Sequence, residues 1–181
     1  MTPKRYTRTA IGLHWLMALL LIGTFGVGLY MTGLKLSPFK LKIYSWHKWA
    51  GVAAFLLVFL RLAWRAGHRP PPLVAGLPRW QEIAAHGLHH LLYLLMIAIP
   101  LSGWLMSSAK GFQTVWFGVL PLPDLLAKNA ELGDLLQTVH VWLNYGFAAL
   151  LAAHVAAALK HHVVDRDDTL TRMLPLLEKN R

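Results

Sequence analysis

The stretch LLQTVHVWLNYGFAALLAAHVAAALKH, residues 135–161, decides the fold of this chain. It is long enough to cross a hydrocarbon core of about 30 Å as a helix, and it carries no charged residue before Lys160. Its two intramembrane histidines, His140 and His154, lie fourteen residues apart. That spacing is about 21 Å of helix axis, and the rotation returns to the same face within about 40°. The stretch therefore predicts a transmembrane helix with one imidazole near each end.

Three further apolar segments have the length of a membrane-spanning helix. We expect helices over residues 9–31, 43–64 and 83–108, in addition to 135–161. The 181-residue chain is 56% hydrophobic and only 14% charged, whereas about a quarter of the residues of a soluble domain are charged. Because backbone polar groups in lipid must be paired internally, the spans are helical. The sequence predicts an all-α integral membrane four-helix bundle, formed by a single domain over residues 1–181.

Two helix starts are marked by capping residues. Ser37 followed by Pro38 has the pattern of an N-cap and a first helical residue, which would begin the second helix with an interfacial turn. Asp134 after Gly133 predicts the N-cap of the fourth helix.

The 18 basic residues are divided unevenly between the two sides of the predicted bundle. The side of the chain termini carries every arginine, in the set Lys4, Arg5, Arg8, Arg61, Arg65, Arg69, Arg79, Lys160, Arg166, Arg172, Lys179 and Arg181. The opposite side carries lysines alone, namely Lys35, Lys40, Lys42, Lys48, Lys110 and Lys128. The positive-inside rule then predicts that both termini are cytoplasmic. The net charge of +10 is explained by this topology, so we expect lipid and no nucleic acid as a partner.

Four histidines fall at two depths in this topology. His14 and His154 lie toward the cytoplasmic side, and His47 and His140 lie toward the outside. The chain has no cysteine, which excludes iron–sulfur clusters and covalently attached haem. Neutral imidazole is a good ligand for haem iron, and ligation on both sides favours electron transfer. Two matched layers predict two bis-histidine haem sites; histidines that only hydrogen-bond to neighbouring helices are the plainer alternative.

Other polar residues of the cytoplasmic side are weaker candidates. Arg61 and Arg65 are candidates to bind haem propionates. His86 and His89 share a helix face and are candidates to contact a propionate, a quinone or a metal. A solvated, charge-complementing role is the alternative for both histidines.

Two other function classes are compatible with a histidine-rich membrane protein. The pattern His86-x-x-His89-His90 is similar to a histidine box of membrane non-haem di-iron enzymes, but that chemistry needs more ligands clustered at one depth. A divalent-metal transporter would ordinarily place carboxylates along its path. The acidic residues of this chain all lie outside the predicted spans or at their ends.

The order and spacing of these residues resemble the bacterial cytochrome b561 family over nearly the whole chain. The segments that carry the resemblance are Tyr6-Thr7-Arg8, His14-Trp15, His47 with Gly51, Arg61-Leu62 with Arg65, Ala85-His86 through His89 to Tyr93, Pro100 with Gly103, His140, His154 through His162, Asp168-Thr169-Leu170 and Arg172-Met173.

The resemblance implies a multi-pass protein of the bacterial inner membrane with two non-covalent haem b groups. It implies that His14, His47, His140 and His154 are the axial ligands, paired as His14 with His154 and His47 with His140. It further implies electron exchange with a quinone pool and with a periplasmic or membrane redox partner. Oxygen or superoxide as a reactant, service as the cytochrome subunit of a larger dehydrogenase, and the oligomeric state are left open by the residues.

Overall fold

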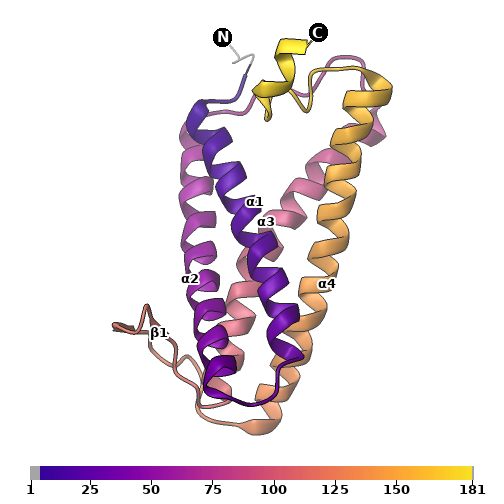
Figure 1. The fold of residues 1–181 in the computed structure, drawn as a ribbon. Coiled ribbons are helices and arrows are strands. Elements are labelled where there is room, and N and C mark those ends of the chain that lie inside the picture. Colours follow the sequence, from indigo (N-terminus) through magenta and orange to yellow (C-terminus); the bar gives the residue numbers. More distant parts are fainter. Residues whose placement is uncertain (1–4, 181) are drawn as a thin grey trace.

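Four long helices account for most of the chain in the computed structural model, which describes residues 5–180 and side chains through residue 177. They are α1 (Arg8–Thr32), α2 (Pro38–Gly67), α3 (Arg79–Ala109) and α4 (Ala130–Lys160). Each is long and apolar enough to cross a membrane, and together they form an up-and-down bundle (Figure 1). The predicted all-α membrane four-helix bundle is confirmed. Lys4 and Arg181, used above for the topology, lie outside the described residues, as does the side chain of Lys179.

Polar side chains outside the apolar spans cap the first turns of α2 and α4. Ser37 caps α2 as predicted, because its hydroxyl accepts a hydrogen bond from the backbone N–H of Lys40 at 3.2 Å. The predicted cap at Asp134 is wrong. Asn129 caps α4 instead, accepting from the N–H of Leu132 at 3.0 Å, and Asp134 lies inside the first turns, where it pairs with Lys110 at 2.8 Å.

Three pairs of helices in the bundle pack closely along one another. Among the described residues, α1 packs along α2, α2 along α3, and most extensively α3 along α4. A buried apolar cluster joins the helices at mid-height, formed by Met17, Val58, Leu92, Leu95, Met96 and Phe147. By contrast, α4 does not pack closely along α1 or α2. The backbone of α4 therefore stands apart from those two helices.

Both described chain ends lie at one end of the bundle, which we call the terminal end (Figure 1). After α4 the chain makes a π-helical turn, His161–Asp165, and a final 3₁₀ segment, Pro175–Asn180. The chain between these two segments is tied across the terminal end by two long-range hydrogen bonds. The indole of Trp15 donates to the carbonyl of Met173 at 2.8 Å, and Arg172 donates to the carbonyl of Pro72 at 2.6 Å.

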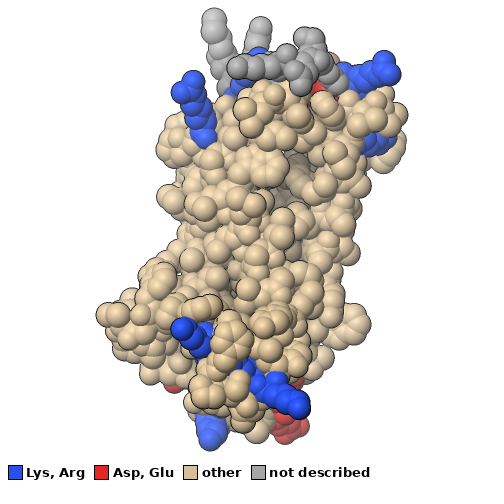
Figure 2. Space-filling view, in the orientation of Figure 1, with Lys and Arg blue, Asp and Glu red and all other residues tan. Residues whose placement is uncertain are grey.

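The opposite end, which we call the loop end, carries the α1–α2 turn and the long α3–α4 connection. That connection contains a small antiparallel hairpin of β1 (Val115–Trp116) and β2 (Leu120–Pro121). Figure 2 shows charged side chains gathered toward the two ends of the visible face, with a belt between them that carries none. This distribution is what a membrane-spanning bundle requires.

Candidate cofactor site

The structure brings His14 of α1 and His154 of α4 together near the terminal end. The centroids of the two imidazole rings are 6.3 Å apart. A metal ion held between two imidazoles at nitrogen–metal distances of about 2 Å needs a centroid separation of about 6 Å. The centroid separation of this terminal pair is therefore the one that a shared metal ion requires.

A second pair lies toward the loop end and has the same spacing. The ring centroids of His47 of α2 and His140 of α4 are 6.4 Å apart. The Nδ1 atom of His140 lies 2.9 Å from the hydroxyl of Ser102 and 3.1 Å from the carbonyl of Ile99. A ligating histidine typically uses one nitrogen for the metal and donates the other N–H to an oxygen. This loop pair is thus arranged with Nε2 of His140 available for a metal.

Two glycines support the rings of the loop pair. A Cβ atom added at Gly28 of α1 would lie 3.2 Å from Cε1 of His47, and one added at Gly103 of α3 would lie 3.1 Å from Cε1 of His140. Each imidazole therefore lies so close to the glycine backbone that a larger side chain there would have to displace the ring. On His47, Nδ1 is buried without a well-formed hydrogen bond to any described residue, and the backbone of Thr24 is the group that faces it.

The backbone of α4 lies apart from α1 and α2, the helices that carry the other ring of each pair. Both pairs span helices that are not closely packed, since α4 contributes one ring to each. Beside His47, an apolar groove of about 510 Å³ runs between α1 and α2, past Gly23 and Trp46. The donor set, the ring spacing and the apolar walls fit haem. They do not fit a hard cation, which prefers oxygen ligands.

Arg61 contacts the terminal pair directly. Its Nη2 atom donates to Nδ1 of His14 at 2.8 Å, because an arginine has no acceptor. The guanidinium groups of Arg61 and Arg65 also lie 5.5 and 5.9 Å from the ring of Tyr93. A His14 that binds metal through Nε2 carries its proton on Nδ1, so Arg61 must then turn to another acceptor. A propionate of haem would be such an acceptor.

The histidines at the start of α3 separate from one another. His89 lies against the terminal pair, with its ring centroid 5.3 Å from that of His154, while its Nδ1 bonds to the carbonyl of Ala85 at 2.7 Å. His86 is exposed, and its carbonyl accepts from Nδ1 of His90 at 2.7 Å. Of the two histidines predicted as weaker candidates, it is therefore His89 whose ring lies beside the terminal pair.

Tyr6 closes the terminal end near the two arginines. Its phenol interacts electrostatically with Arg65, Arg172, Tyr93 and Arg61. Burial raises the pKa of Tyr6 above its usual value of 10.0, against the opposing effect of the arginines. The phenol is therefore neutral at physiological pH.

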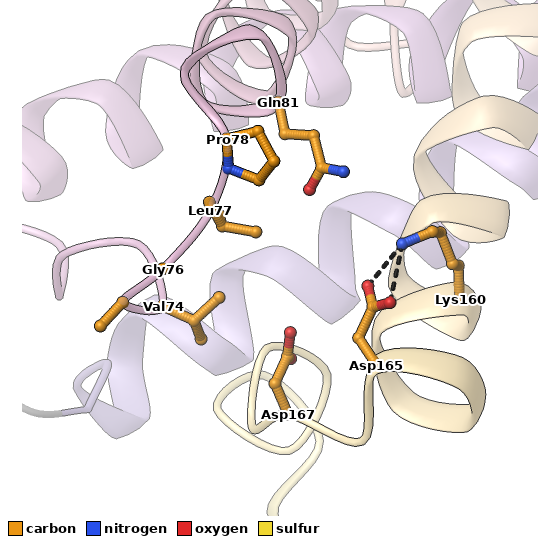
Figure 3. A pocket seen from close by; sticks show the side chains of 9 residues that line it. Val74, Gly76, Leu77, Pro78, Gln81, Lys160, Asp165 and Asp167 are labelled. Carbon is orange, nitrogen blue, oxygen red and sulfur yellow. Dashed lines mark hydrogen bonds and ion pairs between the residues drawn. The ribbon is translucent and has the colours of Figure 1, made fainter.

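A second polar cluster, which the sequence did not reveal, lies where α4 ends. Ligand atoms of His161, Asp165 and Asp167 lie within 4.8 Å of one another. Figure 3 shows Asp165 turned toward Lys160, which it binds at 2.6 Å, beside a pocket of about 290 Å³ that Asp167 also lines. The lysine already neutralises Asp165, and His161 donates to Asp167 at 2.6 Å. The cluster is satisfied internally and ties the π-helical turn to α4.

Asp167 makes this turn sensitive to acid. Burial raises the pKa of Asp167, but the hydrogen bonds from Thr169 and His161 outweigh it and hold the pKa below its ordinary 3.8. The ionised carboxylate is thus favoured in the folded chain, so its stabilisation is present above about pH 4 and is lost as pH falls through the lowered pKa. We expect Asp167→Asn to lower the melting temperature at neutral pH by on the order of 2–4 °C.

The measurement is a series of melting curves of both proteins at decreasing pH. The difference between wild type and Asp167→Asn should shrink below about pH 4. Asp168→Asn is the control, because the side chain of Asp168 is more exposed and, among the described residues, its ion pair is with Arg172 in its own turn. A difference that stayed constant down to strongly acidic pH would contradict this role of the Asp167 charge.

Comparison with known proteins identifies sequences that match along almost the whole chain. The family described as prokaryotic cytochrome b561 matches residues 5–176. Cytochrome b561 homolog 2 of Escherichia coli K12 is 36% identical, covering 96% of this chain and 93% of the relative. Cytochrome b561 homolog 1 of the same organism is 34% identical, covering 95% and 98%. The probable superoxide oxidase CybB of Yersinia pestis is 31% identical, covering 95% and 97%.

Proposed function

Because the chain belongs to the prokaryotic cytochrome b561 family, we propose that it binds two haem b groups, one at each histidine pair, and conducts electrons between the two faces of the membrane. Its family identifies it as a multi-pass b-type cytochrome of electron transfer in the bacterial inner membrane. The proposal adds the number of haem groups, their ligands and their two depths.

One observation carries the proposal. The two ring pairs have nearly equal separations, 6.3 and 6.4 Å, and each pair joins α4 to a helix against which α4 is not closely packed. Hydrogen-bonded histidines would not require that repeated spacing. When bound, haem b supplies reversible one-electron oxidation and reduction. Ligation by two imidazoles leaves no open position on the metal, which favours electron transfer over binding of oxygen.

The neighbouring side chains hold the ligands and the charged groups of the cofactor. Ser102 and the carbonyl of Ile99 orient His140 through its Nδ1 atom. At the terminal end, Arg61 and Arg65 supply positive charge for the propionates, and Arg61 also raises the electrostatic potential around His14. We place the terminal end in the cytoplasm, since every arginine of the chain lies on that side.

We infer that a quinone exchanges electrons at the terminal end. His89 is the better candidate contact of the two histidines predicted for it, since its ring lies beside His154. Its imidazole is able to accept or release a proton as a quinol is oxidised. His86 is the weaker candidate, because the ring contact with His154 is made by His89. Interfacial clefts near a cofactor are the usual location for such lipid-soluble substrates.

Superoxide is a second candidate reactant, favoured by the name of the Yersinia pestis relative. The loop end carries six lysines but only Asp124, Glu131 and Asp134 as acidic residues. A positive surface attracts a small anion and raises its local concentration. Electrons taken from superoxide at the loop end would then reach the quinone at the terminal end.

A visible spectrum of the detergent-purified protein tests the proposal. We expect sharp reduced bands of b-type haem, with two haem groups per chain by the pyridine haemochrome assay. Loss of a band on addition of a quinone to the reduced protein would support the quinone as acceptor. A colourless protein, or a stoichiometry of one, would overturn the two-site proposal.

A further inference from the structure

The tip of the β1–β2 hairpin is uncharged and exposes apolar side chains. From Gly111 to Pro123 the chain reads GFQTVWFGVLPLP, without a single charged residue. Val119 is 82% exposed and Phe117 is 60% exposed, and Phe112 and Leu120 are also exposed. Gln113 and Thr114 are not at the tip; the amide of Gln113 bonds to the carbonyl of Leu122, and Thr114 is buried. An apolar surface of this kind indicates a binding partner.

The hairpin is fixed to α2 by reciprocal hydrogen bonds. The indole of Trp49 donates to the carbonyl of Val115 at 2.7 Å, and the indole of Trp116 donates back to the carbonyl of Trp49 at 3.2 Å. The ammonium group of Lys48 donates to the carbonyl of Phe112 at 2.9 Å. The hairpin therefore has a defined height along α2, at the turn that contains Lys48 and Trp49.

That height is the edge of the hydrocarbon core. Helix α2 has 30 residues, but a hydrocarbon core needs only about 20. Its lysines, Lys40, Lys42 and Lys48, all come before residue 49, and the remaining residues 49–67 have about the length of the core. The arginines of that stretch, Arg61 and Arg65, turn inward to His14 and Tyr93 and do not face lipid. Charged groups are excluded from the core and tryptophan prefers its boundary. The boundary at the loop end thus falls beside Lys48 and Trp49, where the hairpin is attached.

The hairpin extends sideways at this level. Figure 1 shows it projecting past α2 and away from the other helices, not beneath the bundle. Its turn places Phe117 and Gly118 at φ of 52° and 72°. A residue with a Cβ rarely adopts this left-handed conformation, and such strain is typical of functional positions. The turn leaves Phe117 largely exposed, although one side of its ring contacts the rings of Trp49 and Trp116.

We propose that the β1–β2 hairpin is a membrane anchor whose tip, Phe117–Leu120, inserts into the lipid interface of the leaflet at the loop end. The partner is the lipid surface, because a body that projects sideways at the level of the hydrocarbon boundary meets headgroups and the first acyl carbons. Since the tip has no charge to attract anionic lipid, its insertion depends on apolar burial alone. The anchor is independent of the haem proposal and of which leaflet faces the cytoplasm.

Single-cysteine labelling tests this insertion, because the natural chain contains no cysteine. We would introduce Val119→Cys, attach an environment-sensitive fluorophore, and reconstitute the protein in nanodiscs of phosphatidylcholine alone. Leu56→Cys on the exposed face of α2 is the control for the bilayer interior, and Lys35→Cys in the α1–α2 turn is the control for water. All three positions are exposed in the isolated chain, so the label does not disturb packing.

The expected result is a short-wavelength emission for the label at Val119, quenched more strongly by lipid with a quencher near the headgroup than by lipid with one deep in the acyl chain. The label at Leu56 should show the reverse order, and the label at Lys35 should be quenched only by a water-soluble agent. Emission at Val119 equal to that at Lys35 would overturn the proposal. Protection from both kinds of quencher, with disulfide crosslinking of Val119→Cys between two chains, would overturn it in favour of a second copy.

Discussion

Replacing His154 with alanine is expected to reduce the haem content from two groups per chain to one. Alanine supplies no ligand nitrogen, and His14 alone would leave the metal without its second imidazole. The loss should be selective, because His140 lies near the other end of α4 and belongs to the loop pair. Haem quantified per chain gives the stoichiometry, and a redox titration shows which of two waves disappears.

Three companion variants make this result decisive. His140→Ala should remove the wave that His154→Ala retains, so that the two variants are complementary. His90→Ala is the control, because its Nδ1 is bonded to the carbonyl of His86 on its own helix, and it should keep both groups. His89 is close enough to His154 to replace it, so His89→Ala in the His154→Ala background tests for substitution. Loss of the same wave in His154→Ala and His140→Ala would refute the pairing.

Replacing Gly103 with leucine is expected to expel the group at the loop pair while leaving the terminal pair loaded. A Cβ at this position would already stand 3.1 Å from Cε1 and 3.3 Å from Nδ1 of His140. The additional branched carbons must displace the ring and break its contacts with Ser102 and Ile99. Overpacking typically costs about 1–3 kcal/mol. Here it would be relieved by a change in the orientation of one proposed ligand, His140.

The measurement is again haem per chain and the redox titration, with size-exclusion chromatography to verify folding. Gly87→Leu is a matched control on the same helix, because nothing lies within 4 Å of a Cβ built there. Gly103→Ala should give an intermediate result, since the ring needs to move by only a few tenths of an ångström. If Gly103→Leu folded normally and kept both waves unshifted, the glycine would have no part in positioning His140.

The helices were predictable because lipid imposes one strong rule on the sequence. Apolar spans must be helical and about 20 residues long, so the four segments stand out by composition. The ends were less predictable, as the start of α4 shows. Asn129 and Asp134 are both good capping residues, and both lie in water, where hydropathy gives no signal. The choice between them depends on Lys110, which holds Asp134 from α3.

Within the site, only the pairing of the histidines was predictable, because it depends on their depth in the membrane alone. Alternating helix directions bring His14 level with His154 and His47 level with His140, and the structure places the ring centroids of these pairs 6.3 and 6.4 Å apart. The support from Ser102 and Gly103 could not be read from the sequence, because it depends on how α3 crosses α4. The same is true of Arg61, whose contact with His14 depends on the rotation of α2. The ligand roles themselves stay predictions until the variants are measured.

The loose contact of α4 with α1 and α2 has a consequence for how the protein matures. Van der Waals packing normally holds membrane helices together, but along this wall the histidine rings lie where close backbone contact would otherwise be. A ligand that binds only the assembled state stabilises it in proportion to the logarithm of its free concentration. Cofactor supply would then govern the lifetime of newly inserted chains. In a cell short of haem this side of the bundle would be joined only through side chains such as those of the mid-height apolar cluster. Membrane proteases would then remove more of the protein, and its abundance would follow the supply of haem.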